Sequence, residues 1–155
     1  MAQGYWPRPS VTILAQSAVQ LVSPADTNEN TAFMLTIPAG RMGANGGLRV
    51  TLKITATSNA NTKTIRAYLA STVLGTHQTS SYVTYPWQIA IYNRGAQNSQ
   101  VGHNSSANSY GSSSTSYTTG TVDMSVDQVF KITFQKATGT DTLTIDSYTV
   151  ELLSV

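Results

Sequence analysis

The sequence contains no cysteine and few charged residues, and both absences narrow the class of protein. Without cysteine there is no disulfide and no thiolate metal site. Charged residues make up 10% of the 155 positions, against about 25% in an average soluble protein. The nine Lys and Arg residues are scattered singly, so no basic run follows a phosphate backbone. We therefore expect no nucleic-acid partner.

Long apolar runs are missing as well. No stretch approaches the ~18 apolar residues of a membrane span. Residues 1–16 lack the basic leader and apolar centre of a secretory signal, and two prolines interrupt them. We expect no membrane partner and synthesis in the cytoplasm.

Serine and threonine are in excess and together fill 41 positions, 18 Ser and 23 Thr. This composition disfavours a helical bundle, which would be rich in Ala, Leu, Glu and Lys. Hydrophobic residues stand at 40%, enough for one buried core. The composition therefore predicts a single all-β domain.

Apolar residues recur with period two along most of the chain. In Leu48–Thr57 every even position is apolar and every odd position is polar, which predicts a strand with one buried face. The last run, Thr142–Leu153, changes phase, and this predicts a β-bulge near Asp146-Ser147. With similar runs elsewhere, about eight strands are expected. The positions expected to face the core are Leu48, Val50, Leu52, Ile54, Phe130, Ile132, Phe134, Leu143 and Ile145.

Turn residues separate these runs. Ser58–Asn61 and Ala137–Asp141 fit tight connections between antiparallel strands, the second giving a C-terminal hairpin. Between His103 and Thr121, 13 of 19 residues are Ser, Thr or Asn, which predicts a loop.

The mixture of short and long connections predicts a jelly-roll-like antiparallel β-sandwich over residues 18–155. An extended N-terminal arm is expected over residues 1–17. The alternative is an immunoglobulin-type sandwich, which the length and the missing Cys…Trp…Cys core weakly disfavour.

Few residues suggest chemistry. The only histidines, His77 and His103, lie in turn-like contexts and are expected to be exposed in loops. Asp123 with Asp127, and Asp141 with Asp146, are carboxylate pairs of the kind that glycosidases use, but capping of backbone groups explains them better.

The pattern Asp26-x-Asn28-x-Asn30 opens like a calcium loop. It continues with Thr31 and Ile37 where such a loop needs Gly and Glu, so a turn is expected. No catalytic residue, metal ligand or cofactor site is predicted, and the chain is not expected to be an enzyme.

The segment before the first strand suggests an interface instead. Tyr5, Trp6 and Arg8 are residue types that anchor interfaces, and the neighbouring prolines favour an extended tether. Tyr110 and Tyr117 lie in the Ser-rich loop. These five residues are the predicted partner-binding residues.

Four stretches carry a resemblance: SPADTNENTAFMLTIPAGRMGANGGLRV, SNANTKTIRAYL, IYNRG and QKATGTDTLTIDSYTVELL. Over residues 20 to 153 the chain resembles small β-sandwich virion proteins of tailed bacteriophages, found as capsid decoration (cement) proteins, head fibres or tail appendages. The resemblance implies synthesis in a bacterial host and a place on the capsid exterior. It implies that the chain binds the major capsid protein and copies of itself, as a dimer or trimer.

In that class, residues 1–20 and the loops around 71–86 and 97–121 would carry docking specificity. The alternative function is a fibre or appendage module that recognises a host glycan. Its candidate residues are Tyr82, Tyr85, Trp87 and Tyr110, although Trp87 lies in an alternating run and is expected in the core.

Overall fold

A computed structural model describes residues 10–104 and 116–154. These residues form strands and connecting turns, with no helix and therefore none that could span a membrane. The strands are β1 (Ser10–Ser17), β2 (Leu21–Val22), β3 (Asn30–Ile37), β4 (Gly47–Ala56), β5 (Lys63–Leu69), β6 (Thr72–Thr79), β7 (Thr84–Asn93), β8 (Gln100–Asn104), β9 (Tyr117–Gly120), β10 (Gln128–Lys136) and β11 (Leu143–Ser154).

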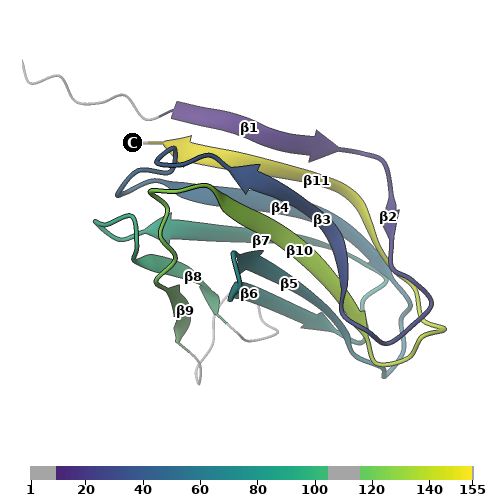
Figure 1. Cartoon of the computed structure of the whole chain (residues 1–155). Helices are drawn as coiled ribbons and strands as arrows, with labels where there is room; N and C mark the ends of the chain where they lie inside the picture. Colours follow the sequence, from purple (N-terminus) through teal and green to yellow (C-terminus); the bar gives the residue numbers. More distant parts are fainter. Residues whose placement is uncertain (1–9, 105–115, 155) are drawn as a thin grey trace, which may run out of the picture.

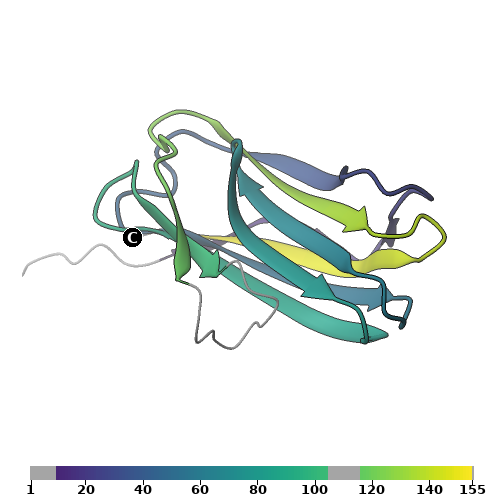
Figure 2. The ribbon, with the colours of Figure 1, turned by 90° about the horizontal axis from the view of Figure 1, so that it is seen from below.

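The strands form two antiparallel sheets packed face to face, one layer over the other (Figure 1; Figure 2). The larger sheet has seven strands in the order β1-β11-β4-β7-β8-β9, with β2 also paired to β11. The smaller sheet has the order β3-β10-β5-β6. The all-β, two-sheet sandwich predicted from the sequence is confirmed.

The strand order is that of a jelly roll. Without β2, β8 and β9, eight strands remain, and numbered along the chain they run 1-8-3-6 in one sheet and 2-7-4-5 in the other. Most connections in such a fold cross from one sheet to the other. The short strands β8 and β9 extend the larger sheet beyond β7.

The predicted core is confirmed, because all nine of its residues lie between the sheets and are at most 3% exposed. Trp87 is also buried, at 1% exposure. The predicted bulge is confirmed as well, since the pairing of β11 with β4 shifts between Ile145 and Ser147. This shift lets both Ile145 and Tyr148 face the core.

The expected C-terminal hairpin is wrong. β10 belongs to the smaller sheet and β11 to the larger one, so Ala137–Asp141 crosses between the sheets. The turn at Ser58–Asn61 likewise crosses, from β4 to β5. Turn residues predict a change of direction but not which sheet the next strand joins.

The expected boundary at residue 17 also needs correction. Ser10–Ser17, assigned to the arm, pairs with β11 from Ser10↔Ser154 to Ser17↔Tyr148, so these residues belong to the sandwich. Residues 1–9 of the arm lie outside the described part of the chain.

The described residues form eleven strands where about eight were expected, and the three that the apolar alternation did not predict are β6, β8 and β9. In β6 the buried positions include Gly75, His77 and Thr79, and in β8 they include Gln100 and Gly102, so neither strand shows an apolar alternation. The small residues have a packing reason. The position of a Cβ on Gly75 is taken by Ile89 Cδ1, and that on Gly102 by the carbonyl oxygen of Leu74.

Candidate docking face

The outer face of the larger sheet carries an apolar row. The register places Val11 opposite Leu153, Leu153 opposite Gly47, Gly47 opposite Tyr92 and Tyr92 opposite Val101. These five residues, the apolar row, come from the neighbouring strands β1, β11, β4, β7 and β8. Val11 is 58% exposed and Tyr92 is 40% exposed. Leu153 and Val101 are partly exposed and Gly47 is buried, so the row presents apolar side chains from β1, β11, β7 and β8 to solvent.

The charges beside the apolar row neutralise each other. One register step further along the face, Arg49 lies opposite Glu151. The Arg49 guanidinium donates to both carboxylate oxygens, from Nε at 2.6 Å and from Nη2 at 2.9 Å. These hydrogen bonds lower the pKa of Glu151 and raise that of Arg49. A partner that covers Arg49 and Glu151 therefore meets a paired ion, whereas Arg94, two residues beyond Tyr92, is exposed.

A shallow hollow of about 300 Å³ lies at the β7–β8–β9 end of the row. Its lining includes Tyr92, Val101, His103 and Tyr117. Tyr117 is 68% exposed, so the predicted partner-binding residue of β9 stands at the rim of an apolar depression. The Tyr117 ring and the depression beside it together form a shape into which a partner side chain can insert.

The outer face of the smaller sheet is different. Arg66 pairs with Glu29 at 3.1 Å, and the Lys131 ammonium lies 4.5 Å from the centre of the Tyr68 ring. Burial alone would raise the pKa of Glu29, but hydrogen bonds from Thr133 and Tyr68 and the nearby Arg66 lower it. A charged, hydrogen-bonded face of this kind is typical of surface that remains in water. The larger sheet is therefore the better docking face.

The two histidines are not exposed loop residues, contrary to the prediction. His77 is 7% exposed in β6, with its ring centre 4.7 Å from that of Tyr85 and 5.8 Å from that of Trp87. Burial lowers its pKa to about 4, with a further contribution from His103. His103 lies half-buried in β8, and burial lowers its pKa too.

Among residues 10–104 and 116–154, neither His77 nor His103 makes a hydrogen bond from its Nε2 to a nucleophile. Both Nε2 atoms are buried and have no hydrogen-bond partner in the described part of the chain, and the same holds for Thr79 Oγ1, Tyr85 OH and Trp87 Nε1. A general base must instead hold a hydrogen bond to the group that it deprotonates. Neutral His77 is an aromatic core residue of the β6–β7 region.

The carboxylates that resembled catalytic pairs accept hydrogen bonds from backbone amides and side chains of neighbouring segments. Asp123 Oδ1 accepts from the Ser125 amide at 2.9 Å, and Asp127 Oδ1 accepts from the Ala39 amide at 2.8 Å. Asp146 accepts from Thr55 Oγ1 at 2.6 Å.

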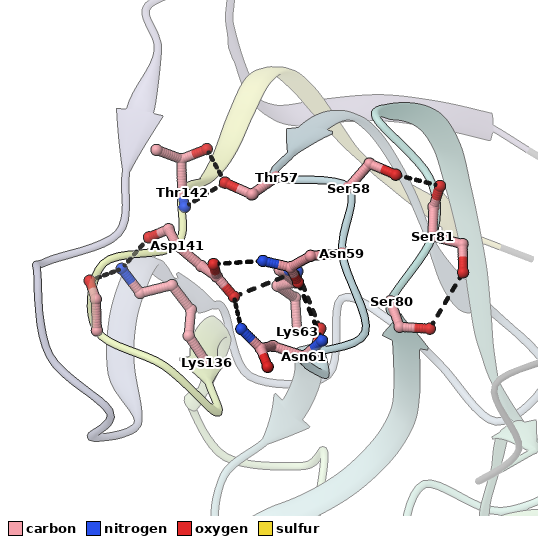
Figure 3. A network of polar contacts seen from close by, with 11 residues as sticks. Thr57, Ser58, Asn59, Asn61, Lys63, Ser80, Ser81, Lys136, Asp141 and Thr142 are labelled. Atoms are coloured by element: carbon pink, nitrogen blue, oxygen red, sulfur yellow. Dashed lines mark hydrogen bonds and ion pairs between the residues drawn. The ribbon is translucent and has the colours of Figure 1, made fainter.

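Asp141 forms the centre of a polar network between the β4–β5 and β10–β11 connections (Figure 3). Its two oxygens accept from Asn59 at 2.7 Å and Asn61 at 3.1 Å, and the buried Lys63 ammonium lies 3.3 Å away. Burial alone would raise the pKa of Asp141, but these contacts lower it. The network joins the β4–β5 and β10–β11 crossings.

The segment that opens like a calcium loop is a turn. Asp26 Oδ1 accepts from the Asn28 amide at 2.9 Å and from Asn30 Nδ2 at 2.8 Å. Within residues 10–104 and 116–154, no three His, Asp or Glu side chains lie close enough together to hold a metal ion.

Of the predicted partner-binding residues, Tyr5, Trp6, Arg8 and Tyr110 lie outside the described residues, and Tyr117 lies on the candidate docking face. The other residues of that face were missed. Tyr92 was the available signal, because it occupies the solvent-facing phase of its strand. The row itself depends on pairing between distant strands.

The aromatic residues considered for glycan binding differ in their exposure to solvent. Tyr82 is 63% exposed, with its ring centre 6.4 Å from that of Tyr85, which is largely buried. Trp87 lies in the core, so no ligand stacks on it from solvent.

No protein-family model and no curated protein sequence matches this chain. Among solved structures, it is similar to the dimeric latent PorU of Porphyromonas gingivalis, with TM-score 0.45 and 9% identity over 94% of this chain. It is similar to the VP2 subviral particle of infectious bursal disease virus, with TM-score 0.44 and 10% identity over 95% of this chain. A structure of the Gx strain of that virus gives TM-score 0.34 and 14% identity over 96%. The chain spans 13%, 33% and 41% of the lengths of these chains.

Proposed function

We propose that this chain is a non-enzymatic structural protein of a tailed-bacteriophage virion. It binds the outer surface of the capsid and bridges neighbouring copies of the major capsid protein. The observation that carries the proposal is the apolar row on the larger sheet, with Arg49 and Glu151 paired beside it. The resemblance of residues 20 to 153 to phage virion proteins gives the partner.

The physical case rests on the cost of desolvation. Burying a free charge is expensive, whereas burying apolar side chains is favourable by about 25 cal/mol per Å². The row offers Val11, Leu153, Tyr92 and Val101, and the adjoining hollow receives a side chain of the partner. Such a face binds a large, weakly charged surface better than a small charged substrate.

The test adds purified protein to particles that lack it and measures occupancy per particle. Tyr92→Lys places an unpaired charge in the apolar row, and we expect it to lower occupancy by about tenfold or more at subsaturating protein. Val129→Lys is the control, since Val129 is 42% exposed on the other sheet, close to the 40% of Tyr92. Circular dichroism verifies that both variants fold. Equal occupancy by the two variants contradicts the proposed face.

Attachment through the N-terminal segment remains a second prediction. Deleting residues 1–9, which include Tyr5, Trp6 and Arg8, is expected to weaken attachment while the sandwich remains folded. A density map of the intact particle would show where this protein lies in the virion. Copies spread over the capsid support decoration, whereas a few copies at a vertex or on the tail support the alternative, a fibre or appendage module.

A further inference from the structure

The edge of the larger sheet that is formed by β1 and β2 contains no charged residue. Residues 10–22 have the sequence SVTILAQSAVQLV, which contains no Asp, Glu, Lys, Arg or proline. They form β1, β2 and the link between them, all along one side of β11 (Figure 1). Four of their apolar residues are well exposed: Val11 at 58%, Ile13 at 57%, Val19 at 73% and Val22 at 61%.

One side of β1 is open to further pairing. Its other side is hydrogen-bonded to β11, and no strand among the described residues pairs with the free side. An edge strand presents a row of unpaired N–H and C=O groups, and proteins normally protect such a row with charges, proline or a covering loop. The only such device in β1 is the register shift between Ile13 and Ala15.

The other edges are protected. β6 lies against β8 and β9, where Thr118 Oγ1 donates to the Leu74 carbonyl oxygen at 2.9 Å. β3 itself contains no charged residue, but Glu29 and Pro38 bound it directly at its two ends. β9 spans four residues. β1 is therefore the edge best suited to accept another strand.

We propose that β1 pairs antiparallel with β1 of a second copy about a two-fold axis at Thr12, so that the two larger sheets become one continuous sheet. In this register Val11 of each copy lies opposite Ile13 of the other. Both residues point to the outer face, since they lie opposite Leu153 and Glu151 of β11. Self-pairing thus forms two equivalent Val–Ile contacts without bringing like charges together.

The occupant is a second copy because the strand is complementary to itself. Two-fold pairing needs a strand whose residues tolerate their own sequence in reverse, and a charge-free strand with β-branched residues on either side of Thr12 meets that need. This inference does not rest on the proposed function, because the dimer forms in solution without particles.

The first experiment measures oligomeric state by sedimentation velocity over a range of concentrations of the full chain. Wild type is expected to dimerise. Ile13→Lys places a charge opposite Val11 in both halves of the interface, and should raise the dissociation constant by about tenfold or more. Met34→Lys is the matched control, because Met34 is 69% exposed on the β3 edge and should leave the dimer intact.

The proposal would be overturned if the wild-type protein stayed monomeric at all concentrations. This holds even if the β1 edge then bound a strand of another protein. Equal weakening by Ile13→Lys and Met34→Lys would overturn it as well.

The second experiment tests the register. Because the chain has no cysteine, Thr12→Cys creates a single thiol. Directly opposed residues of an antiparallel pair have Cα atoms about 4.5–5.5 Å apart, within the range of a disulfide. Oxidised Thr12→Cys is expected to run as a covalent dimer, while Val129→Cys, on the other sheet, stays monomeric under denaturing conditions. Absence of the Thr12→Cys dimer would refute the two-fold axis at this position.

Discussion

Acidification should destabilise the sandwich through His77. The ring is 7% exposed between Tyr85 and Trp87, and its pKa falls from 6.5 to about 4 on folding. Below pH 6.5 His77 becomes protonated in the unfolded chain, whereas in the folded chain it stays neutral until the pH approaches 4. The stability contributed by neutral His77 is therefore complete above about pH 6.5 and is lost as the pH falls toward 4.

The magnitude follows from the two pKa values. The loss attributable to His77 is about 2 kcal/mol at pH 5 and about 3 kcal/mol at pH 4. His103 adds a loss of the same sign, because burial lowers its pKa as well. For a domain with a total stability of about 5–15 kcal/mol, the effect is large.

The assay is urea unfolding at a series of pH values, with the free energy of unfolding taken from each transition. The comparison variant is His77→Phe, which keeps an aromatic ring but cannot titrate. Carboxylates titrate alike in both proteins, so the difference between their pH profiles reports the protonation of His77 together with its electrostatic effect on His103. If wild type and His77→Phe show parallel profiles between pH 7 and pH 4.5, the reasoning about this buried ring is refuted.

Three further predictions concern packing. Phe130→Ala should lower the free energy of unfolding by about 3–5 kcal/mol, measured by denaturant unfolding, because the ring is fully buried between the sheets. Gly102→Ala should cost about 1–3 kcal/mol in the same assay, since its Cβ would meet the backbone oxygen of Leu74; an unchanged midpoint would contradict the close approach of β6 and β8. Asp141→Ala should lower the calorimetric melting temperature, because it leaves the buried Lys63 ammonium without its carboxylate; retention of the wild-type value would mean that the pair does not stabilise the end of the sandwich.

The sequence predicted those strands whose buried positions are apolar. Leu48–Thr57 could be assigned from alternation alone, and the change of phase in β11 located the bulge to within a residue. The same rule failed for β6 and β8, because there the buried positions hold His77 and Gln100. Gln100 is satisfied inside by Asn93 Oδ1 at 2.7 Å and by both backbone groups of Val122. Alternation reports hydrophobicity, and these strands bury hydrogen-bonded or aromatic polar groups.

The candidate docking face could not be predicted from the sequence. Val11 and Leu153 are distant along the chain and become neighbours only through the register of β1 with β11. The neutralisation of Arg49 depends in the same way on its pairing with Glu151 of a distant strand. The sequence can identify a solvent-facing apolar residue such as Tyr92, but only the strand order shows that several such residues share one row.

The pairing of β1 with β11 also determines when the protein can fold. Ser10 pairs with Ser154, so β1 has no partner strand during synthesis until β11 has emerged. Until then SVTILAQSAVQLV is a charge-free segment with strong β-propensity and no partner, the kind of segment that aggregates. Pairings this distant in sequence also make folding slow, because a large loop must close before they can form. Yield on expression should therefore depend on temperature and chaperones more than the stability of the finished sandwich would suggest.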